Sequence, residues 1–224
     1  MLKEQSKKKI IIKQSALYVW DLANTLFQEV WNKERSGFAS YSDWLQNKLG
    51  KTLDQISPWE YENNYKIPYC AGWYFNLDIK PGFRQTLAWT KNNETFSTGN
   101  QAQMTWRGRY LNKKYNFKLS KYFKKLNSTF DYGDANVKSI AMFKSYLKDK
   151  YRAGYQTIVY SDDKLSNLQF FKEAVDKYQK ILPALDLRLY YVLNKSQGIK
   201  DKKWYFSVGT LHDLLKNEKK LKNN

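Results

Sequence analysis

The stretch LYVWDLANTLF, residues 17–27, places one carboxylate, Asp21, directly after a short apolar run. A run of this kind, rich in residues that favour β-structure, predicts a buried strand. An aspartate at the end of a strand has two ordinary explanations, a helix N-cap and a turn. A third is a nucleophile or metal ligand, because open α/β sheets bind their ligands at the carboxyl ends of their strands.

The rest of the chain alternates strand-like runs with helical patterns, which predicts an α/β domain with a mainly parallel sheet. We expect strands over 16–20, 94–100, 155–163, 187–193 and 204–208. We expect helices over 101–115, 118–126, 135–153 (capped by Asp134) and 165–181, and shorter ones after Ser40 or Ser42, after Thr52, after Pro81-Gly82 and over 210–217.

These elements divide the chain into a core and an insertion. The core is expected over 15–27 and 81–215, and residues 28–80 are expected to form a small helical insertion near its active edge. Residues 1–14 and 216–224 are rich in lysine, and we expect them to be mobile basic tails.

The composition excludes several kinds of catalytic centre. The chain of 224 residues is 42% hydrophobic, enough to bury a core, but it contains one cysteine, Cys70, and one histidine, His212. An internal disulfide, a cysteine zinc site and a histidine cluster are therefore excluded, and a Ser-His-Asp triad is disfavoured. Any chemistry must use carboxylates, lysines and hydroxyls.

The N-terminal region argues for a cytoplasmic protein. The start, MLKEQSKKKIIIKQ, has only three consecutive apolar residues, too few for the apolar region of a signal peptide. The sequence also has no run near the ~20 apolar residues that a membrane span requires. We therefore expect a cytoplasmic protein without a membrane span.

The charge is strongly positive, because 39 basic residues against 21 acidic ones give +18. The segment 101–125 holds many of the basic residues, contains no acid, and interleaves them with aromatic residues such as Trp106 and Tyr110. Such a segment could bind nucleic acid, through phosphate contacts and stacking on bases. The alternative is a solvated helix face whose aromatic side chains point into the core.

Three predicted strands end on residues that suit one site. The first ends on Asp21, the second on Ser97-Thr98-Gly99-Asn100, and the third on Asp162-Asp163. Parallel strands bring their carboxyl ends to one edge of the sheet. Carboxylates and a hydroxyl converging there predict a hard-cation site for a phosphate-type ligand.

At this point the chain resembles the haloacid dehalogenase (HAD) superfamily, over about residues 15–210. VWDLANTLF is similar to its first motif, an apolar strand followed by Asp-x-Asp-x-Thr, and IKPGFRQTL is similar to the point where the core resumes after a cap insertion. TFSTGN is similar to the second motif, and TIVYSDDKLSN is similar to the acidic fourth motif. Lys138, on the helix expected before the fourth motif, is similar to the lysine of the third motif.

The resemblance implies a Rossmannoid three-layer α/β/α core and a phosphohydrolase in which Asp21 forms an aspartyl-phosphate. It implies a Mg²⁺ cofactor held by Asp21, the Ala23 carbonyl and Asp162, with Asp163 or Asn167 assisting. Thr98, Gly99, Asn100 and Lys138 would bind the phosphate, and Thr98 and Lys138 would join Asp21 in catalysis. The substrate would be a phosphorylated small molecule or a nucleotide, and residues 28–80 would be the cap.

One position departs from the family pattern. The second aspartate of the first motif, the general acid/base, is Ala23 here. The loss of a general acid typically lowers the rate by ~10²–10⁴. The substrate could have a good leaving group; the chain could resemble the phosphonate-cleaving branch, in which a cap lysine such as Lys48, Lys51 or Lys66 acts; or catalysis could be lost.

Two classes of function follow. The leading hypothesis is a Mg²⁺-dependent HAD-like phosphatase whose turnover is weakened by Ala23. The alternative is a catalytically degenerate HAD-like protein that binds nucleic acid or a ribonucleoprotein through segment 101–125.

Overall fold

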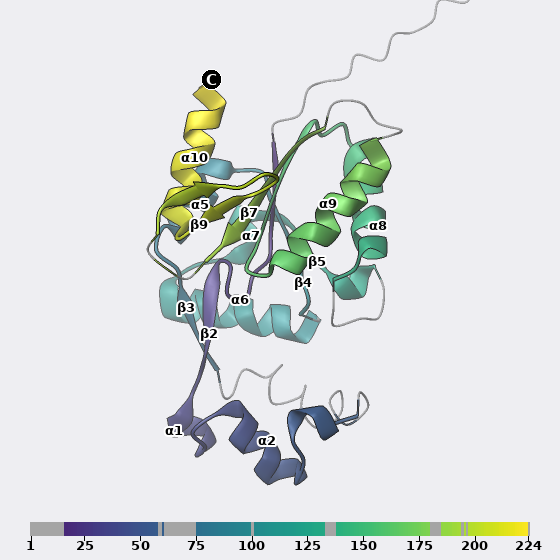
Figure 1. The fold of residues 1–224 in the computed structure, drawn as a ribbon. Helices are drawn as coiled ribbons and strands as arrows, with labels where there is room; N and C mark the ends of the chain where they lie inside the picture. Colours follow the sequence, from purple (N-terminus) through teal and green to yellow (C-terminus); the bar gives the residue numbers. More distant parts are fainter. Residues whose placement is uncertain are drawn as a thin grey trace, which may run out of the picture.

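A seven-stranded sheet forms the centre of the molecule (Figure 1). The computed structural model describes residues 16–57, 60, 75–99, 101–132, 138–179, 185–193, 195 and 197–223. The strand order is β5-β4-β1-β6-β7-β9-β8, and every neighbouring pair is parallel except β8 and β9. The strands are β1 (Leu17–Trp20), β4 (Asn93–Ser97), β5 (Phe123–Ser128), β6 (Thr157–Asp162), β7 (Asp186–Val192), β8 (Ile199–Asp201) and β9 (Phe206–Val208). The predicted α/β class with a mainly parallel sheet is confirmed.

Helices cover both faces of this sheet, which makes three layers (Figure 1). Alternate side chains of β1 point to opposite faces, as the pleat requires. Trp20 packs in one cluster with Leu87 and Leu214, and Val19 packs in the other with Phe143. The first face carries α5 (Phe83–Thr90), α6 (Gln101–Tyr115) and α10 (Leu211–Asn223), and the second carries α8 (Ile140–Arg152) and α9 (Leu165–Gln179). Within the described ranges, no helix has the length and apolar character needed to cross a membrane.

An antiparallel ribbon connects the core to a small helical part (Figure 1). It consists of β2 (Phe27–Trp31) and β3 (Phe75–Ile79), which form a separate two-stranded sheet. The helical part contains α1 (Lys33–Ser36), α2 (Tyr41–Leu49) and the 3₁₀ helix η1 (Leu53–Gln55). The helix predicted after Ser40 or Ser42 is confirmed as α2, which Ser40 caps at its start and Gly50 at its end. The ribbon was not predicted, because 28–80 was expected to be helical.

The predicted helix over 118–126 is wrong. Only the short α7 (Leu119–Tyr122) is helical, and β5 follows it at the edge of the sheet. In β5 the side chains of Lys124, Lys125 and Leu126 are exposed, so the strand lacks a continuous apolar run. Lysines are common on edge strands, where they oppose pairing with another chain, and the sequence pattern resembles a solvated helix.

The helix before β6 begins later than expected. α8 starts at Ile140, and the Ser139 side chain caps it by accepting a hydrogen bond of 3.3 Å from the Met142 amide. Lys138 therefore lies just before the helix, not on it. Asp134, the expected cap, lies outside the described residues.

The predicted C-terminal tail over 216–224 is also wrong, because α10 extends to residue 223. Its polar residues Asn217 and Glu218 are buried. The Glu218 carboxylate accepts hydrogen bonds from the hydroxyls of Tyr18 (2.9 Å) and Tyr190 (2.7 Å) and from Arg188 (3.1 Å). A buried charge with three donors fixes the last helix to the sheet.

We expect Glu218→Ala to lower the free energy of unfolding by about 2–4 kcal/mol, because two buried hydroxyls and an arginine lose their acceptor. Urea denaturation of the variant measures this change. The control is Lys219→Ala, an exposed neighbour, for which we expect a change within about 0.5 kcal/mol. Equal effects of the two substitutions would contradict the importance of the buried network.

Candidate active site at the carboxyl edge of the sheet

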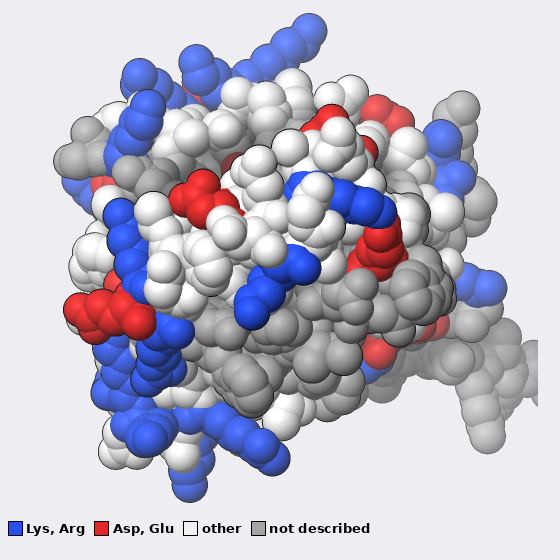
Figure 2. All heavy atoms as spheres, turned by 90° about the horizontal axis from the view of Figure 1, so that it is seen from below, with Lys and Arg blue, Asp and Glu red and all other residues white. Residues whose placement is uncertain are grey.

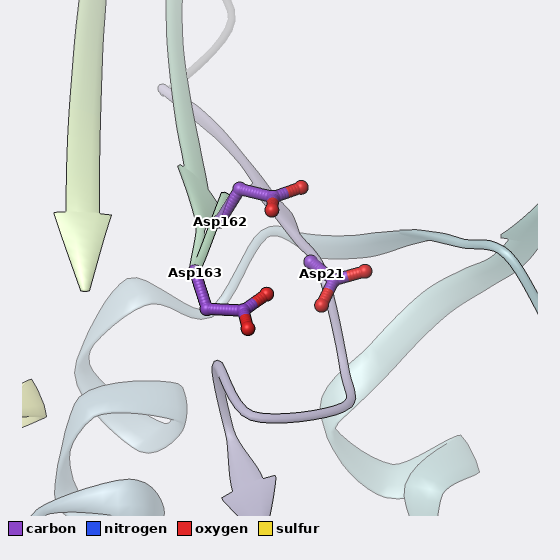
Figure 3. Close-up of side chains that lie close together, drawn as sticks. All are labelled: Asp21, Asp162 and Asp163. Carbon is purple, nitrogen blue, oxygen red and sulfur yellow. The ribbon is translucent and has the colours of Figure 1, made fainter. Parts of the chain in front are cut away.

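Two neighbouring strands bring three carboxylates together (Figure 3). β1 and β6 are parallel, with Trp20 opposite Ser161, so Asp21 and Asp162 follow at the same edge. The Asp21 amide donates a 2.9 Å hydrogen bond to the Ser161 carbonyl, which continues the strand pairing to Asp21. One carboxylate oxygen each from Asp21, Asp162 and Asp163 lies within 4.8 Å of the others.

The loop after Asp21 is a tight turn that orients the carboxylate. Asn24 has a left-handed backbone, with φ of 59°, a conformation that asparagine tolerates better than most residues. Its amide donates to the Phe27 carbonyl at 2.7 Å, so the chain turns directly into β2. The Thr25 hydroxyl donates to Asp21 Oδ2 at 3.3 Å. Ala23 lies half-buried in this turn.

Lys138 bridges the ends of the two strands. Its Nζ lies 2.6 Å from Asp21 Oδ1, 2.6 Å from Asp162 Oδ2 and 3.1 Å from the Tyr160 hydroxyl, and its side chain is fully buried. Burial lowers the pKa of the Lys138 ammonium, but the charges of Asp162 and Asp21 outweigh that effect and raise it. Lys138 is therefore a fixed positive charge at the site.

The two consecutive aspartates have different surroundings. The Asp162 carboxylate accepts hydrogen bonds from Lys138, from the Tyr160 hydroxyl, from Asn167 Nδ2 (3.0 and 3.1 Å) and from the Lys164 amide (2.9 Å). Asp163 is half-buried, and within the described parts of the chain its carboxylate accepts no hydrogen bond. Four residues thus donate hydrogen bonds to the Asp162 carboxylate. The Asp163 carboxylate accepts none from the described residues, so its oxygens could accept a ligand.

The cluster carries an excess of negative charge. Burial raises the pKa of Asp21 to about 7, and the nearby Asp162 charge adds to this effect, while Lys138 opposes it. Burial and the Asp162 charge also raise the pKa of Asp163. One contacting ammonium does not balance three carboxylates, so a further cation would stabilise their charged forms.

The residues fit a hard divalent cation. Mg²⁺ takes oxygen ligands at ~2.0–2.1 Å in octahedral geometry, so its ligand oxygens lie roughly 3–4 Å apart. The observed separations, within 4.8 Å, need only a small closure of side chains. Carboxylate oxygens and an unbalanced negative charge are the donor set that such an ion prefers.

The expected phosphate-binding turn follows β4, the other neighbour of β1. Thr98 is half-buried and Gly99 is buried, whereas Asn100 lies outside the described residues. A Cβ atom at Gly99 would come within 2.4 Å of Arg107 Nη1, so a larger residue there would require the Arg107 side chain to shift. The structure brings Asp21, Lys138, Asp162 and Asp163 together, and it places Thr98 and Gly99 on the adjacent strand end.

Sequence reasoning did not single out Arg107 or Lys80. The buried Arg107 side chain binds Glu29 Oε1 through Nε (2.9 Å) and Nη2 (2.7 Å), and it lies 3.4 Å from Ser97 Oγ. Lys80 has a buried Nζ that finds no hydrogen-bond partner among the residues that the structure describes. Burial lowers the pKa of Lys80 to about 8, and the Asp163 and Asp21 charges oppose this shift. The sequence has many basic residues and does not distinguish Arg107 and Lys80 from the others. Their burial in the folded protein distinguishes them.

The basic segment 101–125 does not present the aromatic surface that stacking on bases needs. Phe117 and Phe123 are buried, and Trp106, Tyr110, Tyr115 and Tyr122 pack partly buried against the core. Lys114 forms a 2.9 Å ion pair with Asp78. In Figure 2 basic side chains lie mainly around the margins of the face, with acidic ones among them. These contacts favour the alternative, a solvated face whose aromatic residues belong to the core.

Three lysines were considered for phosphonate cleavage, and the structure describes two of them, neither of which forms an ion pair with the carboxylates of the cluster. Lys48 is exposed on α2, and Lys51 forms an ion pair with Glu60. Lys66 lies outside the described residues.

No protein-family model matches the sequence, and no curated protein matches it. Among solved structures, a magnesium complex of a HAD family enzyme from Bacteroides thetaiotaomicron is 19% identical, with a TM-score of 0.47, and the match covers 72% of this chain and 90% of that chain. A complex of the same enzyme with magnesium and inorganic phosphate is 17% identical, with a TM-score of 0.45 and coverage of 72% and 91%. The magnesium and the inorganic phosphate in these structures are ligands of that enzyme.

We expect Asp21→Asn to change how stability depends on pH. The Asp21 pKa is about 7 in the folded protein and 3.8 is its ordinary value. Between these values the unfolded chain has lost a proton that the folded protein keeps, so the ionisation of Asp21 lowers wild-type stability as the pH rises. The free energy of unfolding of the variant minus that of the wild type should therefore increase from about pH 4 to about pH 7.

Urea denaturation across this pH range, with a chelator present, measures the difference. Asp176→Asn is the control, because its side chain is exposed and solvent screens its charge. A difference for Asp21→Asn that stays constant with pH would contradict the raised pKa.

Proposed function

We propose that this protein is a Mg²⁺-dependent HAD-like phosphohydrolase that acts on a phosphorylated small molecule or nucleotide, with Asp21 as the nucleophile. One observation carries the proposal: Asp21 ends its strand between the Lys138 ammonium and the Thr25 hydroxyl, beside Asp162 and Asp163. Phosphoryl transfer depends mainly on positioning and charge neutralisation, and this arrangement supplies both.

The reaction would have two steps. In the first, an Asp21 carboxylate oxygen attacks phosphorus, the bond from phosphorus to the leaving oxygen breaks, and the leaving oxygen takes a proton from solvent water. In the second, water attacks the phosphorus of the aspartyl-phosphate, the bond from phosphorus to the Asp21 oxygen breaks, and the proton of the attacking water passes to solvent, which gives inorganic phosphate and free Asp21. Lys138 would offset the charge of Asp21 and the phosphoryl oxygens, and the turn of Thr98, Gly99 and Asn100 would hold those oxygens.

The magnesium ion would be held by Asp21, the Ala23 carbonyl and Asp162, with Asp163 assisting. Bound there, it would neutralise charge on the phosphoryl group and keep Asp21 ionised. Asp162 would also orient Lys138, whose Nζ lies 2.6 Å from Asp162 Oδ2.

Residues 28–80 would serve as the cap, in line with the ribbon that carries α1 and α2. The Lys80 amide donates to the Leu26 carbonyl at 3.1 Å, and Arg107 of α6 binds Glu29 of β2. The first contact ties the ribbon to the loop after Asp21, and the second ties it to α6. A cap attached there would close over the cluster and exclude water.

Ala23 predicts a preference for good leaving groups. Alanine cannot donate a proton to a departing alkoxide, whereas an aryl oxide departs with little protonation. Turnover of aryl phosphates should therefore exceed turnover of alkyl phosphates.

Hydrolysis of an aryl phosphate with Mg²⁺ tests the proposal. We expect magnesium-dependent turnover in the wild type, none above background in Asp21→Asn, and a raised magnesium requirement in Asp163→Asn. Asp176→Asn, the surface control, should match the wild type. Turnover that is equal in wild type and Asp21→Asn, or absent from both, would contradict the proposed function.

Ala23→Asp tests the missing acid. An aspartate in this turn should raise the turnover of alkyl phosphates by up to ~10², the lower range for a general acid, and change aryl phosphate turnover little. Ala23→Asn is the control of similar size that cannot donate in this way. An equal gain from both variants would show that acid catalysis is not what position 23 lacks.

A further inference from the structure

A cavity of about 240 Å³ opens at the same edge of the sheet as the carboxylate cluster. It lies where β9 ends and where α5 and α10 begin, and the root of the β2–β3 ribbon closes its other side. Its polar lining comes from Gln28, Lys80, Lys195 and Thr210, with the backbone of Gly209. Because β6, β7 and β9 are adjacent and parallel, this cavity lies beside the strand end that carries Asp162 and Asp163.

The lining is positively charged. It contains two lysines and, among the described residues, no acidic side chain. The N-terminus of α5, capped by Gly82 without a side-chain hydrogen bond, also faces this region and adds partial positive charge. Such a lining favours a ligand with negative charge.

Lys80 is the strongest single observation. Its Nζ is buried and has no hydrogen-bond partner among the described residues, an arrangement that is unfavourable for folding unless a ligand uses it. Lys80 lines the cavity, and the charges of Asp163 and Asp21 also act on its ammonium. A ligand that spans the two would place an anionic group against Lys80.

Backbone packing fixes the other side of the cavity. A Cβ atom at Gly209 would lie 2.1 Å from the Lys195 carbonyl oxygen and 2.9 Å from the Gln197 amide, so only glycine allows this approach. The Gly209 amide donates to the Gly198 carbonyl at 3.1 Å. The loop that carries Lys195 is therefore held against the end of β9, and its side chain is exposed at the rim.

We propose that this cavity binds a second anionic group, a phosphate or a carboxylate, of the same substrate whose phosphoryl group reacts at Asp21. The inference rests on the proposed function and narrows its substrate class to phosphate esters with a second anion. The cavity is smaller than the ~300–1,000 Å³ of sites for whole drug-sized ligands, and suits one end of the substrate.

Calorimetry with matched probes tests this inference without turnover. Asp21→Asn protein with Mg²⁺ is titrated with fructose bisphosphate against fructose monophosphate, and with phosphoglycerate against glycerol phosphate. We expect the member with a second anionic group to bind about tenfold more tightly in at least one pair, the size of one charged hydrogen bond. The pair that shows the preference tells whether the second group is a phosphate or a carboxylate.

Three further substitutions test whether the preference arises in the cavity. Lys195→Gln should remove most of it, and Lys203→Gln, an exposed lysine outside the lining, should leave it unchanged. Lys80→Met should also remove it while raising the melting temperature, because an unpartnered buried ammonium is lost. If Lys80 had only a structural role, Lys80→Met would instead lower the melting temperature.

Three results would overturn the inference: equal binding of both members of each pair, equal losses in Lys195→Gln and Lys203→Gln, or no binding of any probe. These are separate from failure of the proposed function, which is the absence of magnesium-dependent aryl phosphate turnover. If the protein hydrolyses aryl phosphates but shows no preference for probes with a second anionic group, the proposed function stands and the second anion site is refuted.

Discussion

The ion pairs of Lys138 with Asp21 and Asp162 are the constraint on which the site depends. A fully buried ammonium lies 2.6 Å from one carboxylate on each of two neighbouring strands. Removing one partner of a buried ion pair typically costs 3–5 kcal/mol, because a buried charge is left uncompensated. The adjacency of β1 and β6, the turn before α8 and the position of the nucleophile are therefore linked. The same charges that hold the strand ends together would provide the electrostatics for the proposed phosphoryl transfer.

The two buried lysines near the cluster are in opposite situations. Lys138 has three hydrogen-bond partners, and neighbouring carboxylates raise its pKa. Lys80 has no partner in the described part of the chain, and burial lowers its pKa. The partners of Lys138 compensate for the burial of its charge. A buried ammonium without a partner lowers the stability of the folded state, and an anionic ligand at Lys80 would remove that cost. The two consecutive aspartates show a similar contrast. Asp162 accepts hydrogen bonds from four residues, whereas Asp163 accepts none from the described residues.

Buried charges also attach the outer elements to the sheet. Glu218 joins α10 to β1 and β7, and the Lys150–Glu94 pair, at 2.6 Å, joins α8 to β4. Arg107 joins α6 to the ribbon through Glu29. Part of the large basic excess is therefore structural, and the aromatic residues of segment 101–125 pack against the core. The high positive charge by itself does not indicate a nucleic-acid surface here.

The sequence by itself determined the parallel α/β class, the strand that ends on Asp21, and the acids and lysine that form the cluster. Local apolar runs and strand-end residues carry that information, because parallel strands align their carboxyl ends. Only the tertiary structure decided the strand β5, the β2–β3 ribbon, the docking of α10, the different surroundings of Asp162 and Asp163, and the burial of Lys80 and Arg107. These features depend on long-range packing: an edge strand with lysines resembles a solvated helix, and one lysine among many is distinguished only by what surrounds its nitrogen.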